Sequence, residues 1–80
     1  MLEIEYSPDF LSLLRKIKNN ADKEKVKKQI KKIIEDPEIG KPMRYARKGT
    51  REVYLGSFRL SYALVDNKLI FLDLYHKDEQ

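Results

Sequence analysis

Apolar and polar residues alternate at the start of the chain and again along its last thirty residues. Leu2 to Tyr6 alternates with a period of two, which is typical of a strand. Three later segments are rich in the aliphatic and aromatic residues of strands: Arg51 to Leu55, Phe58 to Val65 and Leu69 to Tyr75. The dipeptides Gly56-Ser57 and Asp66-Asn67 between them suit two-residue hairpin turns. The pattern therefore predicts an N-terminal strand and a C-terminal three-stranded meander.

Between these strands the apolar residues recur every three to four positions, which is the period of a helix. The first such stripe is Phe10, Leu13, Leu14 and Ile17, and the second is Val26, Ile30, Ile33 and Ile34. Ser7 is the expected cap of the first helix, with Pro8 at its first position, and Asp22 is the expected cap of the second. The second helix should end before Pro37, because the residue before proline avoids helical geometry.

These elements predict an α+β fold in the order strand, helix, helix, strand, strand, strand. The connection between the helices is short, so we expect an antiparallel helix hairpin packed on a small antiparallel sheet. We expect one domain over residues 1–80, with residues 38–49 as a basic linker. If both turns hold, Tyr54 pairs with Arg59, Arg59 with Leu74, and Ser57 with His76.

The predicted register divides the side chains between two faces. The expected core face comprises Val53, Leu55, Phe58, Leu60, Tyr62, Leu64, Leu69 and Phe71. The opposite face comprises Glu52, Tyr54, Arg59, Ser61, Ala63, Ile70, Leu72, Leu74 and His76.

Composition narrows the possible functions. The chain has 80 residues with no cysteine and one histidine, so we expect no disulfide, no metal site and no cofactor. We see neither a signal peptide nor an apolar run long enough to cross a membrane, and we expect a cytoplasmic protein. Seventeen Lys and Arg against thirteen Asp and Glu give a net charge of +4, which favours polyanionic partners.

Arg59 is the leading catalytic candidate because a charge in the middle of a strand needs a reason. Its guanidinium would clamp a phosphate and stabilise transition-state charge; the alternative is a structural ion pair, for example with Glu52. His76 is a candidate general acid or base, although a histidine near a chain end is more often only solvated. Lys77 lies beside it.

Further basic and aromatic residues are candidates for RNA binding. The basic residues, Arg44, Arg47, Lys48 and Arg51, would neutralise backbone phosphates. The aromatic residues, Tyr45, Tyr54 and Tyr75, would stack on unpaired bases, although packing is the commoner role for a single tyrosine. The lysine-rich face of the second helix could bind nucleic acid, although a solvated helix face is the commoner explanation.

Three segments together carry a family resemblance: PMRYARKGTREV from residue 42, GSFRLSYAL from residue 56 and LDLYHKDEQ from residue 72. With the order of the predicted elements, they resemble the RelE/ParE superfamily of toxins from type II toxin–antitoxin systems. RelE-like members cut mRNA in the ribosomal A site, whereas ParE-like members poison DNA gyrase. The resemblance implies a toxin held inactive by a cognate RelB-like antitoxin.

Carried over by position, the resemblance implies specific residue roles. Arg59 matches the middle-strand arginine that contacts the scissile phosphate, Lys77 the place of a second catalytic arginine, and His76 the histidine before it. Glu52 and Tyr54 stand where RelE has two lysines, and a terminal catalytic tyrosine is absent unless Tyr75 serves. The hypothesis is a ribosome-dependent mRNA endonuclease acting by transesterification. The alternatives are a gyrase poison and a non-catalytic basic RNA-binding module.

Overall fold

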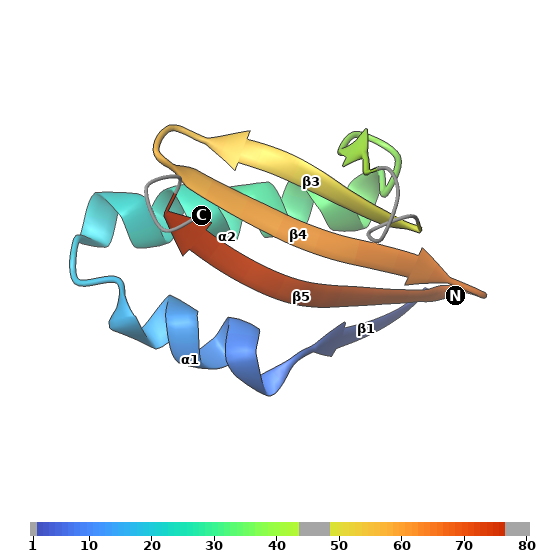
Figure 1. Ribbon diagram of the computed structural model, residues 1–80, viewed down its shortest axis with the longest axis horizontal. Coiled ribbons are helices and arrows are strands. Elements are labelled where there is room, and N and C mark those ends of the chain that lie inside the picture. Colours follow the sequence, from blue (N-terminus) through green and yellow to red (C-terminus); the bar gives the residue numbers. More distant parts are fainter. Residues whose placement is uncertain (1, 44–48, 77–80) are drawn as a thin grey trace.

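A computed structural model describes residues 2–43 and 49–76 of the chain. The elements, in chain order, are β1 (Glu3–Tyr6), α1 (Pro8–Lys16), α2 (Asn20–Glu35), β2 (Lys41–Pro42), β3 (Thr50–Leu55), β4 (Phe58–Val65) and β5 (Lys68–His76). Figure 1 shows α1 and α2 running in opposite directions as a hairpin beside the sheet. The predicted α+β order is confirmed, and each of the four predicted strands is present within a residue or two of its expected bounds.

The five strands form one sheet in the order β1-β5-β4-β3-β2. The predicted meander β3-β4-β5 is antiparallel as expected, and β2 also pairs antiparallel with β3. β1 joins the sheet by pairing in parallel with β5, which the sequence did not indicate. The predicted linker also contains β2, in which Lys41 pairs with Glu52 and Pro42 with Arg51. Proline is tolerated there because β2 is an edge strand.

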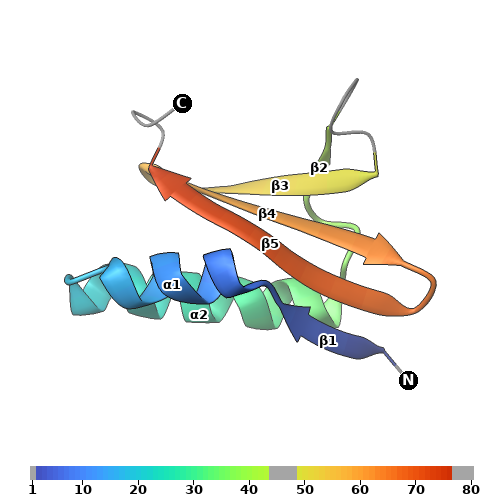
Figure 2. The same cartoon turned by 60° about the horizontal axis from the view of Figure 1, so that its bottom comes forward.

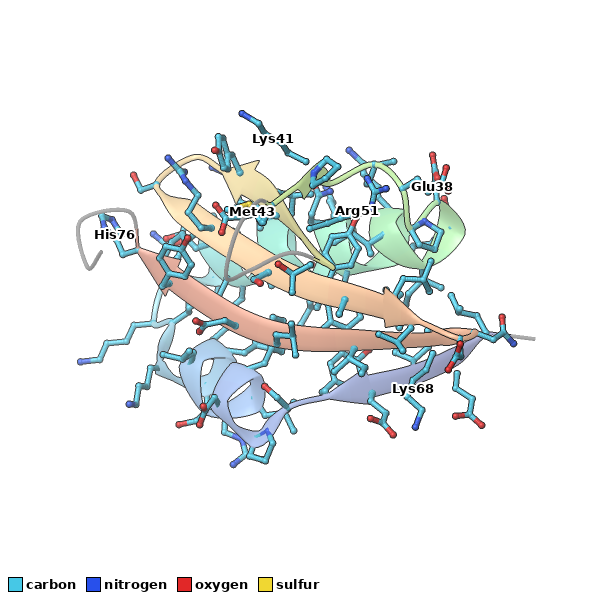
Figure 3. The ribbon with its side chains drawn as sticks, turned by 45° about the vertical axis from the view of Figure 1, so that its right-hand side comes forward. Glu38, Lys41, Met43, Arg51, Lys68 and His76 are labelled. Atoms are coloured by element: carbon cyan, nitrogen blue, oxygen red, sulfur yellow. The ribbon has the colours of Figure 1, made fainter. Side chains whose placement is uncertain are left out.

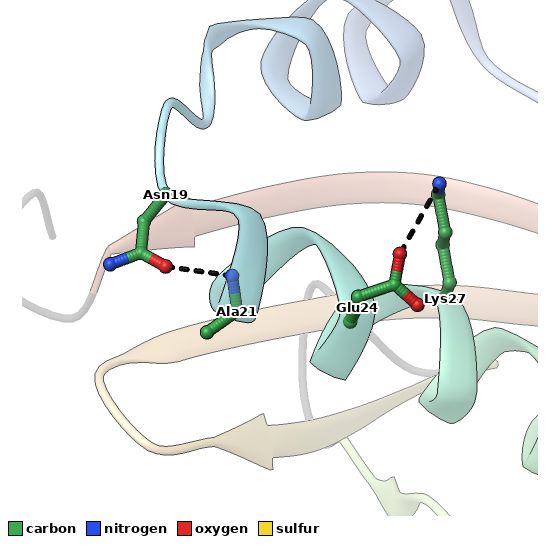
Figure 4. Close-up of polar contacts among 4 residues, drawn as sticks. All are labelled: Asn19, Ala21, Glu24 and Lys27. Atoms are coloured by element: carbon green, nitrogen blue, oxygen red, sulfur yellow. Dashed lines mark hydrogen bonds and ion pairs between the residues drawn. The ribbon is translucent and has the colours of Figure 1, made fainter.

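Side-chain caps define where both helices begin. The Ser7 hydroxyl accepts a hydrogen bond from the Phe10 backbone N–H at 3.0 Å, and Pro8 opens α1 as predicted. The cap of α2 is Asn19, not Asp22 as predicted: its side-chain oxygen accepts from the Ala21 N–H at 2.8 Å (Figure 4). Asp22 lies instead in the first turn, where its negative charge suits the positive end of the helix dipole.

Both helices cover the same face of the sheet, and no helix of the described residues covers the opposite face (Figure 2). The fully buried side chains between the two layers are Phe10, Val26, Ile33, Leu60, Tyr62, Leu69 and Phe71. Two residues expected in the core are exposed instead: Ile34 and Leu64. Neither helix in the described part of the chain is long and apolar enough to cross a lipid bilayer.

A β-bulge in β5 changes the predicted register. Both turns form as predicted, with Leu55 opposite Phe58 and Val65 opposite Lys68, but between Tyr62↔Phe71 and Ser61↔Asp73 the residue Leu72 is extra. The Ser7 hydroxyl donates to the Leu72 carbonyl at 2.7 Å, so the residue that caps α1 also provides a hydrogen-bond donor for the backbone carbonyl of the bulge.

Beyond the bulge every β5 side chain is on the other face from the one predicted. Arg59 pairs with Tyr75 rather than Leu74, and His76 pairs with Phe58 rather than Ser57. Leu74 is 2% exposed and belongs to the core, which corrects its assignment to the face of Arg59.

A buried tyrosine fixes the segment that leads from α2 to β2. The Tyr62 hydroxyl donates to the Pro37 carbonyl at 2.7 Å and accepts from the Gly40 N–H at 2.9 Å. Gly40 lies so close that a Cβ added there would be 2.5 Å from the Tyr62 oxygen. A larger residue at this position would therefore force the Tyr62 side chain or the local backbone to shift.

Candidate functional site

Arg59 lies on the uncovered face of the sheet, near the start of β4, and is half-buried. Its guanidinium carbon is 3.8 Å from the centre of the Tyr54 ring, on the neighbouring strand β3. One guanidinium nitrogen, Nη1, also donates to the Phe58 carbonyl at 3.3 Å. These contacts hold the cation over an aromatic face, a favourable arrangement that leaves guanidinium N–H groups to bind an anion.

A carboxylate and a tyrosine hydroxyl lie on the same face as Arg59. Glu52 is 5% exposed, and its Oε2 accepts a hydrogen bond of 2.7 Å from the Tyr75 hydroxyl. Tyr75 is the cross-strand partner of Arg59, so the two side chains are neighbours on adjacent strands.

Sequence reasoning missed the contact between Tyr75 and Glu52. It depends on the bulge at Leu72, which brings Tyr75 to the face of Arg59. Leu72 and Leu74 are both leucines two positions apart. The hydrophobic pattern therefore does not distinguish which of the two faces the core.

His76 lies on the helix-covered side of the sheet, away from the face of Arg59. Its ring makes an edge-to-face contact with Phe58, with 5.5 Å between ring centres and an angle of 80°. Phe58 packs against the core, and Arg59, the next residue in β4, points to the opposite face. The expectation that His76 and Arg59 share a face was therefore wrong.

The structure places only some of the predicted basic and aromatic residues. Tyr54, on β3, is 60% exposed, and the Arg59 guanidinium lies over one face of its ring. Arg51 donates from Nη1 to the carbonyls of Gly40 at 2.8 Å and Glu38 at 3.0 Å, so it fastens the segment before β2. Lys41, which was not among the predicted site residues, is exposed on β2 at the outer edge of the sheet (Figure 3).

The remaining predicted residues lie outside the described part of the chain. They are Arg44, Tyr45, Arg47, Lys48 and Lys77.

Comparisons with known proteins agree on the class of protein. A model of the ParE toxin family of type II toxin–antitoxin systems (parDE) matches residues 4–80. No curated protein matches the chain in sequence. Similar solved structures include Escherichia coli YafQ, with 25% identity, a TM-score of 0.76, and coverage of 99% of this chain and 97% of YafQ.

Two further structures share the fold at lower identity. One is a chain of the intact E. coli RelBE toxin–antitoxin complex, with 19% identity, a TM-score of 0.79, and coverage of 95% of this chain and 96% of that one. The other is the YoeB/ParE toxin from Agrobacterium tumefaciens, with 12% identity, a TM-score of 0.80, and coverage of 94% and 98%. At these identities the likeness shows a common fold.

Proposed function

We propose that this chain, which belongs to the ParE toxin family of type II toxin–antitoxin systems, is a ribosome-dependent endonuclease that inhibits translation by cutting mRNA. The observation that most supports this proposal is the position of Arg59. It is a half-buried cation on the uncovered face of the sheet, with its guanidinium carbon 3.8 Å from the centre of the Tyr54 ring. A cation that the fold has already oriented loses little freedom when it binds a phosphate, and it stabilises developing charge at low reorganisation cost. The proposal gives Arg59 this role at the scissile phosphate.

The proposed reaction is a transesterification within the RNA. The 2′-oxygen forms a bond to the adjacent phosphorus, the bond from phosphorus to the 5′-oxygen breaks, and the products are a 2′,3′-cyclic phosphate and a 5′-hydroxyl. One proton leaves the 2′-hydroxyl and one is given to the 5′-oxygen. Arg59 stabilises the phosphorane between these steps, and Lys77 and His76 are the predicted participants in charge neutralisation and proton transfer. Because His76 lies on the other face from Arg59, it reaches the RNA only where the strand passes the end of β5.

The surroundings of Arg59 suit single-stranded RNA. Tyr54 and Tyr75 lie on either side of Arg59 in the sheet, and an exposed ring such as that of Tyr54 offers a base a stacking surface. The proposed additional contacts to mRNA and ribosomal RNA are Arg44, Tyr45, Arg47 and Lys48. Arg51 was expected among them, but it lies in β3 opposite the buried Tyr62, on the other face of the sheet from Arg59, and it fastens the segment before β2. The proposed site uses no cofactor and no metal.

A cognate antitoxin is the proposed protein partner. The structurally similar E. coli RelBE structure is a toxin–antitoxin complex, and a RelB-like antitoxin would hold this chain inactive in the cytoplasm. An excess of positive charge, +4 over the chain, favours an acidic partner segment.

Poisoning of DNA gyrase is the second candidate function. Two observations favour it: the matching family model describes ParE toxins, and a buried carboxylate, Glu52, occupies a place where RelE-like nucleases carry a lysine. Near a scissile phosphate, that carboxylate would repel the substrate rather than attract it.

Expression in bacteria with separate readouts tests the proposal and its rival. Wild type, Arg59→Ala and the control Arg15→Ala are each induced, and incorporation of labelled amino acid and of labelled thymidine is followed; Arg15 is an exposed α1 residue remote from the site. The proposal predicts rapid arrest of protein synthesis by wild type and Arg15→Ala only. Arrest of DNA synthesis first, in all three strains, contradicts it and favours gyrase.

A further inference from the structure

A hollow of about 340 Å³ opens on the helix-covered side of the sheet, at the end of the molecule where α1 meets α2. It lies between the α1–α2 connection and the adjoining ends of β4 and β5. Its apolar lining includes Leu13, Ile17, Phe58 and Leu74. The volume is at the lower end of the range of small-molecule sites. The proposed nuclease role of Arg59 does not use this hollow, because Arg59 lies on the opposite face.

We propose that this hollow binds a guanine nucleotide, either free or as one unit of an RNA strand. The first observation behind this is an aromatic wall. Phe58 and His76 both line the hollow and meet edge to face at 5.5 Å. The two rings stand at 80° to each other, and a base that enters the hollow can stack on an aromatic ring of its lining.

The second observation is a carboxylate at the rim. Asp22 lines the hollow from the first turn of α2. A carboxylate accepts two parallel hydrogen bonds, and guanine offers adjacent N1–H and N2–H donors on one edge. Adenine and cytosine present an unprotonated ring nitrogen at the corresponding place, so Asp22 favours guanine over them.

The third observation is a pair of lysines at the same rim, Lys16 and Lys18, which flank the end of α1. They supply positive charge beside the base site, where a nucleotide carries its phosphate. The side-chain oxygen of the neighbouring Asn19 accepts a hydrogen bond from the α2 backbone, and its amide nitrogen points away from the helix (Figure 4). The hollow thus offers aromatic rings for stacking with the base, a carboxylate for the hydrogen-bonding edge of guanine, and two lysines for the phosphate.

An acidic peptide with an apolar anchor is the competing occupant. The basic rim would suit it as well, but Asp22 would then face like charge without a donor to pair with. The observations therefore favour the nucleotide, and binding of the peptide is an outcome of the test.

The test is a titration of the ¹⁵N-labelled protein followed by NMR, with GMP, AMP, CMP and UMP as separate probes. We expect saturable shifts at Phe58 and His76 with GMP, and binding at least about ten-fold weaker for the other three. Guanosine, which lacks the phosphate, should bind more weakly than GMP. A comparison of the trinucleotides UGU and UUU shows whether the site recognises guanine within an RNA strand. If UGU binds more tightly than GMP, the site is assigned to RNA. If the two bind equally, it is assigned to the free nucleotide.

Three variants connect the binding to the named residues. Asp22→Asn should abolish the preference for guanine, with a loss of about ten-fold in GMP affinity. The double variant Lys16→Ala, Lys18→Ala should bring GMP to the affinity of guanosine. Lys25→Ala is the matched control, an exposed α2 lysine outside the hollow, and should bind as wild type. Thermal melts of each variant show that it is folded.

The proposal is overturned if no nucleotide shifts these signals, if all four nucleotides bind alike, or if Lys25→Ala weakens binding as much as the rim variants do. Shifts of Phe58 and His76 by an acidic, leucine-containing peptide alone would likewise replace it with a peptide-docking surface. None of these measurements involves mRNA cleavage, so their results do not depend on whether Arg59 acts in a nuclease site.

Discussion

Removal of a single oxygen atom in Tyr62→Phe should destabilise the fold far more than its size suggests. The Tyr62 side chain is fully buried, and its hydroxyl both donates to the Pro37 carbonyl and accepts from the Gly40 N–H, at 2.7 and 2.9 Å. Phenylalanine keeps the ring but leaves a buried N–H and a carbonyl without their partner. Leaving such groups unpaired costs about 2 to 3 kcal/mol, which lowers the melting temperature of a domain of this size by about 10 to 20 °C.

The same variant should change how stability depends on alkaline pH. Burial raises the pKa of Tyr62, although the Gly40 hydrogen bond and the Arg51 charge act in the opposite direction. The folded protein therefore holds this proton more tightly than the unfolded chain does. The contribution of Tyr62 to stability is complete below about pH 10, the ordinary pKa, and is lost as the pH rises through the raised pKa. Tyr62→Phe should lack this part of the alkaline loss.

The assay is urea unfolding of wild type, Tyr62→Phe and Tyr54→Phe, at neutral pH and across the alkaline range. Tyr54 is 60% exposed, so its variant should change the free energy of unfolding by no more than about 0.5 kcal/mol. If Tyr62→Phe unfolds at the same urea concentration as Tyr54→Phe, the Tyr62 hydrogen bonds do not hold the segment before β2, and our reasoning on this contact is refuted.

Three further substitutions test other contacts, each by thermal and urea unfolding. Gly40→Ala should destabilise by about 1 to 3 kcal/mol, because its Cβ would be 2.5 Å from the Tyr62 oxygen, and Gly40→Ala with Tyr62→Phe should cost less than the sum of the two; additive losses would contradict the clash. Ser7→Ala should cost about 1 to 2 kcal/mol, since the residue caps α1 and satisfies the bulge; an unchanged midpoint would rule out both roles. Tyr75→Phe should cost about 1.5 to 3 kcal/mol by removing a donor from the buried Glu52 carboxylate, and a melting temperature equal to wild type would show that the carboxylate does not need it.

Much of the fold could be predicted because local signals agree with one another. Ser7-Pro8 marks a helix start by capping chemistry, and the structure uses it as expected. Asp66 and Asn67 adopt the positive φ values that a two-residue hairpin turn requires, 53° and 69°, which these residue types tolerate. Register next to each turn was therefore correct.

The errors arose where a distant contact decides the local structure. The cap of α2 is Asn19 rather than Asp22, because both residue types cap helices and only the chain path selects between them. The carbonyl of the bulge residue Leu72 accepts a hydrogen bond from a hydroxyl 65 residues earlier in the chain, that of Ser7. The bulge determines which β5 residues lie on the face of Arg59. The prediction that Arg59 and Tyr54 share a face was therefore correct, whereas Tyr75 was missed and His76 was wrongly assigned to that face.

The most direct test of the central claim is to map the 5′ ends of a messenger RNA in a reconstituted translation reaction, with wild type, Arg59→Ala and Arg15→Ala. We predict new 5′ ends within the coding region, only when the message is translated, with wild type and Arg15→Ala, and a loss of at least about a hundred-fold in cleavage with Arg59→Ala. Intact message in the presence of active wild-type toxin, or undiminished cleavage by Arg59→Ala, would contradict the account.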